Sequence, residues 1–207
     1  YGPAAAGWRD PQTWARLEGG PGDDQLTISA GGLSLGGEGN DTLWGGSALN
    51  GGAGDDVIHS WRAATILGDD GNDMITGSYQ ADEIYGGAGH DRIFGNEGDD
   101  RISGGTEGDW IEGRQGRDLI SGGDGNDIIR GENEAFLIAV RDATWLTPDY
   151  LDGLSEDTLL GGDGFDQIHG DFGGDYIHGG ADADQLFGGY GADTIMGGTG
   201  NDMLDGG

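Results

Sequence analysis

A nine-residue period constrains this chain more than any other feature, and it runs from residue 68 to residue 130 without a gap. Each of its seven units begins with Gly and carries Ile at the eighth position. The sixth position is always an aspartate: Asp73, Asp82, Asp91, Asp100, Asp109, Asp118 and Asp127. A fixed period of this kind predicts a repeat fold in which each unit packs on its neighbours.

The unit has the form G-G-x-G-x-D-x-U-x, where U is a large apolar residue. Its last three residues predict a short strand with U pointing inward, and the first six predict a turn in which Gly adopts left-handed backbone angles. Two units complete one turn of a flattened coil. Equivalent aspartates are therefore eighteen residues apart, on strands separated by ~4.8 Å.

Stacked carboxylates at ~5 Å repel each other by ~3 kcal/mol at an effective dielectric constant of about 20. This repulsion would be repeated along both edges of the coil, so a divalent cation is expected between successive aspartates. A shell of carboxylate and carbonyl oxygens suits Ca²⁺ better than Mg²⁺, which requires a near-ideal octahedron.

The repeat resembles that of the RTX (repeats-in-toxin, haemolysin-type) family, and the resemblance extends with interruptions from Gly19 to the last residue. It implies an all-β fold, a right-handed parallel β-roll (β-helix) that binds calcium. Such proteins are typically exported from bacteria by type I secretion and fold outside the cell. By resemblance, the chain would be a bacterial, secreted or surface-associated module.

The composition agrees with a metal-dependent fold. The 207 residues include 49 Gly, 39 acidic residues, nine Arg and no Cys, and the formal net charge is −30. Such a surface is a poor partner for nucleic acid or for anionic membranes. No run approaches the ~20 apolar residues of a membrane span, and residues 1–7 do not resemble a signal peptide. Both ends suggest a piece of a longer or trimmed chain.

The first two segments depart from the regular repeat. Residues 1–18 predict a short helical cap that begins near Asp10-Pro11 and places Trp8, Trp14 and Leu17 over the open end of the coil. An exposed aromatic binding site is the alternative. In residues 19–67, metal-type units alternate with shorter segments, which gives coil turns of 17, 15 and 17 residues.

Calcium is expected on only one edge of the 19–67 segment. Asp24, Asp41 and Asp56 lie on the same edge as Asp73. The opposite edge is expected to be closed by apolar side chains, namely those of Leu33, Leu35, Leu49 and Ile66.

The pattern breaks at residues 131–151 and resumes over residues 152–207. Phe136 stands where Asp is expected, so metal binding on that edge is predicted to lapse, and Asp142 and Asp149 could be stray ligands. If residues 131–151 form one full coil turn, the edge assignment is kept. The insertion could pack on an apolar stripe of the roll that includes Trp110, or it could dock a partner through Trp145 and Tyr150.

The candidate metal ligands are the sixth-position aspartates, which pair along two edges to give about twelve Ca²⁺ sites. One edge carries Asp24, Asp41, Asp56, Asp73, Asp91, Asp109, Asp127, Asp166, Asp184 and Asp202. The other carries Asp82, Asp100, Asp118, Asp157, Asp175 and Asp193. Acids elsewhere in the turns, such as Asp55, Asp70 and Glu97, are interpreted as solvated.

Nothing in the sequence indicates a catalytic site. It has no Cys or Lys nucleophile and no G-x-S-x-G motif, and a carboxylate pair repeated at every turn indicates a ligand rather than an acid/base dyad. The four histidines, His59, His90, His169 and His178, are weak evidence for zinc. We therefore expect no enzyme activity and no organic cofactor.

Two functions remain open. The first is a calcium-dependent folding and structural module of a larger secreted or surface protein, which is disordered without metal. The second is an accessory module that binds a polysaccharide or a surface through an outer aromatic face. In that case it would belong to a secreted enzyme of the epimerase, protease or lipase type, or to an adhesin.

Overall fold

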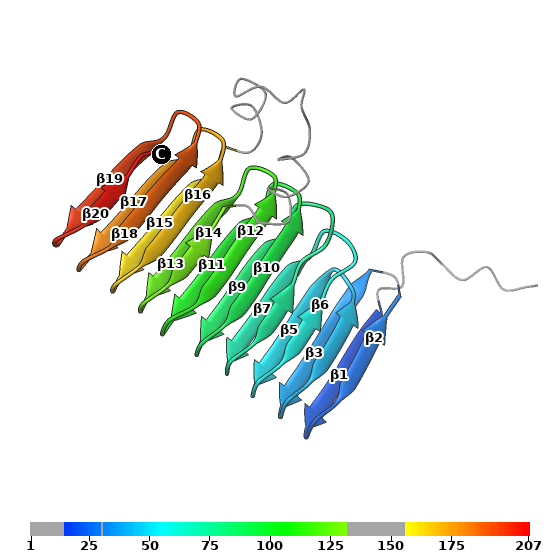
Figure 1. Ribbon diagram of the computed structural model, residues 1–207. Helices are drawn as coiled ribbons and strands as arrows, with labels where there is room; N and C mark the ends of the chain where they lie inside the picture. The colour runs from blue at the N-terminus through cyan, green and yellow to red at the C-terminus, as the bar shows by residue number, and fades with distance from the viewer. Residues whose placement is uncertain (1–14, 30, 132–155) are drawn as a thin grey trace, which may run out of the picture.

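In the computed structural model, the chain winds between two sheets of ten parallel strands each (Figure 1). The described residues are 15–29, 31–131 and 156–207. All odd-numbered strands form the first sheet and all even-numbered strands form the second, so that consecutive strands always lie in opposite sheets. The structure therefore confirms the all-β parallel solenoid, and it contains no helix within the described residues.

The strands are short, as the three-residue x-U-x segment predicts, and most continue into the glycines of the following turn. The first sheet contains β1 (Ala15–Pro21), β3 (Gly32–Glu38), β5 (Ala48–Ala53), β7 (Thr65–Asp70), β9 (Glu83–Ala88), β11 (Arg101–Thr106), β13 (Leu119–Asp124), β15 (Thr158–Asp163), β17 (Tyr176–Ala181) and β19 (Thr194–Thr199). The second contains β2 (Gln25–Ile28), β4 (Thr42–Gly45), β6 (Val57–His59), β8 (Met74–Thr76), β10 (Arg92–Glu97), β12 (Trp110–Gln115), β14 (Ile128–Arg130), β16 (Gln167–Phe172), β18 (Gln185–Tyr190) and β20 (Met203–Asp205).

The core lies between the sheets and consists of the eighth-position side chains. In the first sheet, Ile84 pairs with Ile102 and Ile102 with Ile120, each eighteen residues on, and all three are buried. Because successive side chains on a strand point to opposite faces, fixing this residue inward leaves the seventh and ninth positions on the outer faces. The period thus sets the register of every regular rung.

The shorter N-terminal rungs have the expected lengths. Arg16 pairs with Leu33, Leu33 with Ala48 and Ala48 with Thr65, which are steps of 17, 15 and 17 residues. Of the four side chains expected to close this edge, Leu49 and Ile66 are buried in the core, and the other two differ from the expectation. Ser34 occupies the inward position, whereas Leu33 and Leu35 are only partly buried on the outer face. Gly36 begins the next unit, and counting back from it places Ser34 at the eighth position.

The expected N-terminal helix is wrong in the part that the structure describes. Ala15, Arg16 and Leu17 belong to strand β1, which pairs in parallel with β3. Hydrogen bonding to an existing sheet edge overrides the local capping signals around Asp10-Pro11, because propensity is a weak prior against tertiary pairing. The remainder of the expected cap, with Trp8 and Trp14, lies outside the described residues.

The stack continues directly across the irregular region. Strand β13 pairs with β15, and β14 pairs with β16, so no further strand lies between the members of either pair. The possibility that residues 131–151 form a full coil turn, on which the edge assignment was made to depend, is therefore not realised, although the edge assignment holds. The inserted residues lie in the sequence between β14 and β15.

Candidate metal centres

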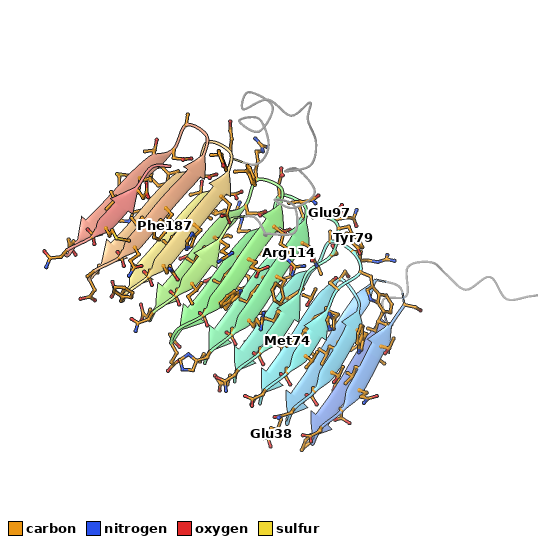
Figure 2. The ribbon with its side chains drawn as sticks, viewed as in Figure 1. Glu38, Met74, Tyr79, Glu97, Arg114 and Phe187 are labelled. Atoms are coloured by element: carbon orange, nitrogen blue, oxygen red, sulfur yellow. The ribbon has the colours of Figure 1, made fainter. Side chains whose placement is uncertain are left out.

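The candidate sites lie in the turns at the two edges of the roll. We call the turns that lead from the first sheet to the second the first edge, and those that return the second edge. In Figure 2, Glu38 marks the first edge, and Tyr79 and Glu97 mark the second, on opposite sides of the roll. The turn path requires a left-handed residue at the second position, which is Gly87 (φ +124°) in one unit and Asn96 (φ +83°) in the next. This explains the second Gly of the repeat.

The sixth-position aspartates form a continuous hydrogen-bonded row along each edge. The backbone N–H of Asp73 donates to Oδ1 of Asp91 at 2.8 Å, and the N–H of Asp91 donates to Oδ1 of Asp109 at 2.8 Å. The first-edge row contains Asp24, Asp41, Asp56, Asp73, Asp91, Asp109, Asp127, Asp166, Asp184 and Asp202. The second-edge row contains Asp82, Asp100, Asp118, Asp157, Asp175 and Asp193. The structure thus brings together the sixteen residues that the period singled out.

Two contacts in these rows were not expected. Asp118 donates its N–H to Asp157, and Asp127 donates its N–H to Asp166, in each case across 39 residues of sequence. Metal binding was expected to lapse here because Phe136 replaces an aspartate. The register removes that gap, since Gly131 supplies the first position and Asp157 the sixth position of the same enlarged turn.

The second carboxylate oxygen is the chemically unusual atom. Oδ2 is buried and has no hydrogen-bond partner in Asp41, Asp56, Asp73, Asp91, Asp100, Asp109, Asp127, Asp166, Asp184 and Asp193. A buried carboxylate oxygen normally accepts hydrogen bonds, because leaving it unsatisfied costs about 1–3 kcal/mol or more. Repetition of this feature on successive rungs indicates that something other than a protein donor belongs beside these atoms.

Each of these oxygens lies against the first glycine of its own turn, next to the position that a Cβ atom would occupy. We call this position and the oxygen atoms around it the glycine cradle. A Cβ atom on Gly86 would overlap Oδ2 of Asp91 and would lie 2.5 Å from the carbonyl oxygen of Gly104, which belongs to the next turn of that edge. The same arrangement recurs at Gly68, with Asp73 and the carbonyl of Gly86. The invariant first Gly therefore leaves open a space lined by one carboxylate oxygen and one carbonyl oxygen.

The pKa values of the row aspartates show that the ionised carboxylates are disfavoured when no metal is present. Burial raises the pKa of Asp73, Asp100, Asp109 and Asp166 from the ordinary 3.8 to about 7. It raises the pKa of Asp56, Asp91 and Asp127 to about 6. Donation from the preceding aspartate's N–H lowers these pKa values, and at Asp73 and Asp109 the neighbouring carboxylates raise them further. The negative charge therefore needs a counter-charge inside the row.

The donor set fits a hard divalent cation. Each cradle offers only oxygen, from the aspartate of its own turn and from a backbone carbonyl of the next, and the spacing varies between rungs of 15, 17 and 18 residues. Ca²⁺ accepts irregular shells of oxygen ligands, whereas Zn²⁺ favours N and S. Within the described residues, the aspartate rows included, no group of three or more His, Asp or Glu side chains is placed to hold a metal ion.

Asp82, the first aspartate of the second-edge row, is the exception. Its Oδ2 accepts the N–H of Ser78 at 2.6 Å, and its Oδ1 accepts the N–H of Ala64 at 2.7 Å. Ser78 holds the second position of its turn without the left-handed angle found at the second position of the other described nine-residue turns. The backbone thus satisfies both oxygens of Asp82.

A second ladder runs outside the first edge and was missed from the sequence. The N–H of Asp55 donates to Oδ1 of Asn40, and the N–H of Asn72 donates to Oδ1 of Asp55, at 3.0 and 2.8 Å. These fifth-position bonds point back to the preceding rung, opposite to the sixth-position bonds. Asp55 is therefore not merely solvated. The sequence signal that could have revealed this is an Asp or Asn at the fifth position of four successive first-edge units, namely Asp23, Asn40, Asp55 and Asn72.

The histidines do not form a site together. His59 stacks on Trp44 with ring centroids 4.3 Å apart, and His169 stacks on Phe187 at 4.6 Å. His178 lies in β17 of the first sheet, while His169 lies in β16 of the second. Trp110, on the expected apolar stripe, is partly buried and lies near the Arg92 guanidinium. Trp145 and Tyr150 lie outside the described residues, so neither role of the insertion is tested.

Comparison with known proteins adds one match. The sequence model of the RTX calcium-binding nonapeptide repeat, in four copies, matches residues 35–48, 48–62, 67–102, 103–134, 152–186 and 187–207, which is more than half of the chain. A comparison with curated proteins gave no significant match.

Proposed function

Because the chain belongs to the RTX calcium-binding nonapeptide repeat family, we propose that it is a β-roll module whose fold depends on Ca²⁺ bound along both edges. The observation that carries this proposal is the row of buried Oδ2 atoms. In Asp73, Asp91 and Asp109, each Oδ2 is without a hydrogen bond and faces a glycine cradle.

The residues that would hold the ions are the stacked aspartate pairs. The first edge has nine such pairs and the second edge has five. We exclude the pair Asp82/Asp100, because Ser78 already satisfies Asp82. The remaining thirteen pairs, one more than the sequence suggested, would lower the formal charge from −30 to −4 if each bound one Ca²⁺.

Calcium would supply the counter-charge that the protein lacks. Without it, rows of buried carboxylates face one another, and the fold must either hold protons or unfold. With it, the ion binds oxygen from two successive turns and so links them, because binding free energy to a site absent from the unfolded chain is folding free energy. The module would therefore be disordered where free calcium is scarce.

This dependence suggests where the protein works. RTX proteins are typically secreted, and a chain that stays unfolded at low calcium and folds at millimolar calcium suits export followed by folding outside the cell. We propose that the module is the structural part of a larger secreted or surface protein. No role in catalysis is assigned to it.

Far-UV circular dichroism tests the proposal directly. The chain in EGTA should show a disordered spectrum, and millimolar Ca²⁺ should restore the β signal, whereas equal Mg²⁺ should not. The variant Asp73→Asn should require more Ca²⁺, and the matched control Asp55→Asn, at an exposed fifth position, should not. A β spectrum that is the same with and without Ca²⁺ would refute the proposal.

A further inference from the structure

Two successive turns of the second edge share a design that differs from the metal-type turn. They are residues 60–64 and 78–82, which we call the aromatic turns, and both read Ser-aromatic-x-Ala. Ser60 Oγ donates to the carbonyl of Arg62 at 2.6 Å, and Ser78 Oγ donates to the carbonyl of Gln80 at 3.2 Å. Both turns are thus closed by a serine hydroxyl, and the second one also removes the metal cradle at Asp82.

In place of a metal cradle, these turns expose aromatic side chains. Trp61 and Tyr79 occupy equivalent positions on neighbouring rungs and are 51 % and 75 % exposed. The Trp61 ring lies against Gly45, where a Cβ atom would be 3.1 Å away, and the neighbouring Trp44 is also exposed. Figure 2 shows Tyr79 at the second edge beside Glu97, which holds the same position one rung further on. Large aromatic side chains gathered in the open indicate a binding surface.

A hollow lies at the other end of the same two turns. It measures about 480 Å³, and Ala63, Ala64 and Ala81 keep it open because their side chains are small. Its polar lining comes from Ser47, Thr65, Asp82, Glu83, Asp99 and Arg101. Hydroxyl, carboxylate and guanidinium groups supply both hydrogen-bond donors and acceptors there.

This combination decides the chemistry of the ligand. Exposed flat rings on successive rungs suit a chain-like ligand that presents flat apolar faces along the roll axis, and the hollow suits hydroxyl groups that both donate and accept. Asp82, Glu83 and Asp99 outnumber Arg101 in the lining, so there is no excess of positive charge to favour an anionic polymer. We propose that the aromatic turns bind a neutral polysaccharide, with one sugar ring stacked on Trp61 and Tyr79 and a neighbouring unit in the hollow.

The test is affinity electrophoresis of the calcium-saturated chain in native gels that contain hydroxyethyl cellulose, galactomannan, laminarin or dextran. Polygalacturonate serves as the anionic comparison. At least one neutral polymer should retard the wild-type chain, and the double variant Trp61→Ala/Tyr79→Ala should bind it at least about tenfold more weakly, because few residues dominate such interfaces. Tyr79→Phe keeps the ring and should retain most of the binding.

The matched control is Tyr190→Ala. Tyr190 is 63 % exposed, lies on the same edge and belongs to a metal-type turn, and its loss should leave binding unchanged. Far-UV spectra at saturating Ca²⁺ separate this proposal from the calcium one, because the double variant should still fold. Retention by none of the neutral polymers, retention by polygalacturonate alone, or equal weakening by Tyr190→Ala would overturn the proposal.

Discussion

A sixth-position aspartate within a row, Asp82 excepted, uses its two oxygens for different tasks. Oδ1 accepts the N–H of the equivalent residue one turn earlier and so fixes the spacing of the stack, as Asp91 does for Asp73. Oδ2 is left for the cradle at the first glycine. Asparagine can imitate the first task but not the second, because it keeps an acceptor and loses the charge.

This division of roles between the two oxygens predicts different results for two isosteric substitutions. Asp109→Asn should lower the number of bound Ca²⁺ by at least one, because Asp109 pairs with both Asp91 and Asp127. Asp82→Asn should leave that number unchanged, since Ser78 and Ala64 already occupy its oxygens. Native mass spectrometry of the calcium-saturated chains counts the ions. A Ca²⁺ lost from Asp82→Asn would show that the Ser78 amide does not displace metal.

A second prediction concerns Ser34, the polar residue in the apolar column of the first sheet. It is fully buried between Leu17 and Leu49, and its Oγ has no hydrogen-bond partner. Ser34→Val removes the unsatisfied hydroxyl, so it should raise the free energy of unfolding by about 1–3 kcal/mol. Thermal unfolding at saturating Ca²⁺ measures the change.

The control for Ser34→Val is Ser103→Val on the outer face of the same sheet. That substitution buries little and removes no orphaned group, so its effect should stay within about 0.5 kcal/mol. A lower midpoint for Ser34→Val than for the wild type would mean that the column has no room for the added methyl groups.

At the scale of elements, the insertion between β14 and β15 leaves the register of the neighbouring strands unchanged. Aspartates in regular turns are 18 residues apart, and those that span the insertion are 39 apart, which leaves 21 extra residues within one turn. The strands on both sides nevertheless pair in the regular register. Loop length adds only slowly to the entropic cost of closing a loop, so a turn can carry such an addition without disturbing the stack.

Deleting residues 132–152 should therefore leave a folded roll. The deletion joins Gly131 to Gly153 and recreates a nine-residue unit, GGLSEDTLL, with Asp157 at its sixth position. Its far-UV spectrum and calcium midpoint should match those of the parent chain. Removing 21 residues from the regular repeats instead, residues 88–108, shifts the phase by three and should abolish folding. Failure of the first deletion to fold would show that the insertion supports the rungs.

The sequence predicted the elements where period and chemistry agree. The strands of residues 68–130, the opposite sheets of successive strands and the stacked aspartates all follow from spacing. The pairing of β13 with β15 could not be read from spacing, because an insertion within a turn and an added rung keep the same edge assignment. Strand β1 was missed because the helix signals near Asp10 are local, whereas the pairing with β3 is not.

At the scale of the whole molecule, the two edges are unequal. The first-edge row begins at Asp24, whereas the second-edge row begins at Asp82, after the turns that hold Ser47 and Trp61. The N-terminal rungs are thus joined by candidate metal sites on one side only. The start of the other edge carries the aromatic turns, so the proposed sugar-binding surface adjoins the first residues of the second-edge row.

The pKa values lead to a prediction about the metal-free chain. Burial raises the pKa of Asp73, Asp100 and Asp109 from 3.8 to about 7, so the folded state holds these protons more tightly than the unfolded state. Their contribution to stability is fully present below about pH 4 and is lost as the pH rises through 7. Acidification of the calcium-free chain from pH 8 to pH 5 should therefore increase its β signal.

With calcium the same groups predict little pH dependence between pH 8 and pH 6. The carboxylates are ionised both in the unfolded chain, where the pKa is near 3.8, and in the metal-bound fold, so folding exchanges few protons. Circular dichroism of the chain freed of metal on a chelating resin, followed by calcium titration at each pH, measures both effects. Asp109→Asn has no proton to bind at that position, so it should show a smaller gain on acidification. A metal-free β signal that falls as the pH drops would contradict the burial of these carboxyls and, with it, the reason that the rows require an ion.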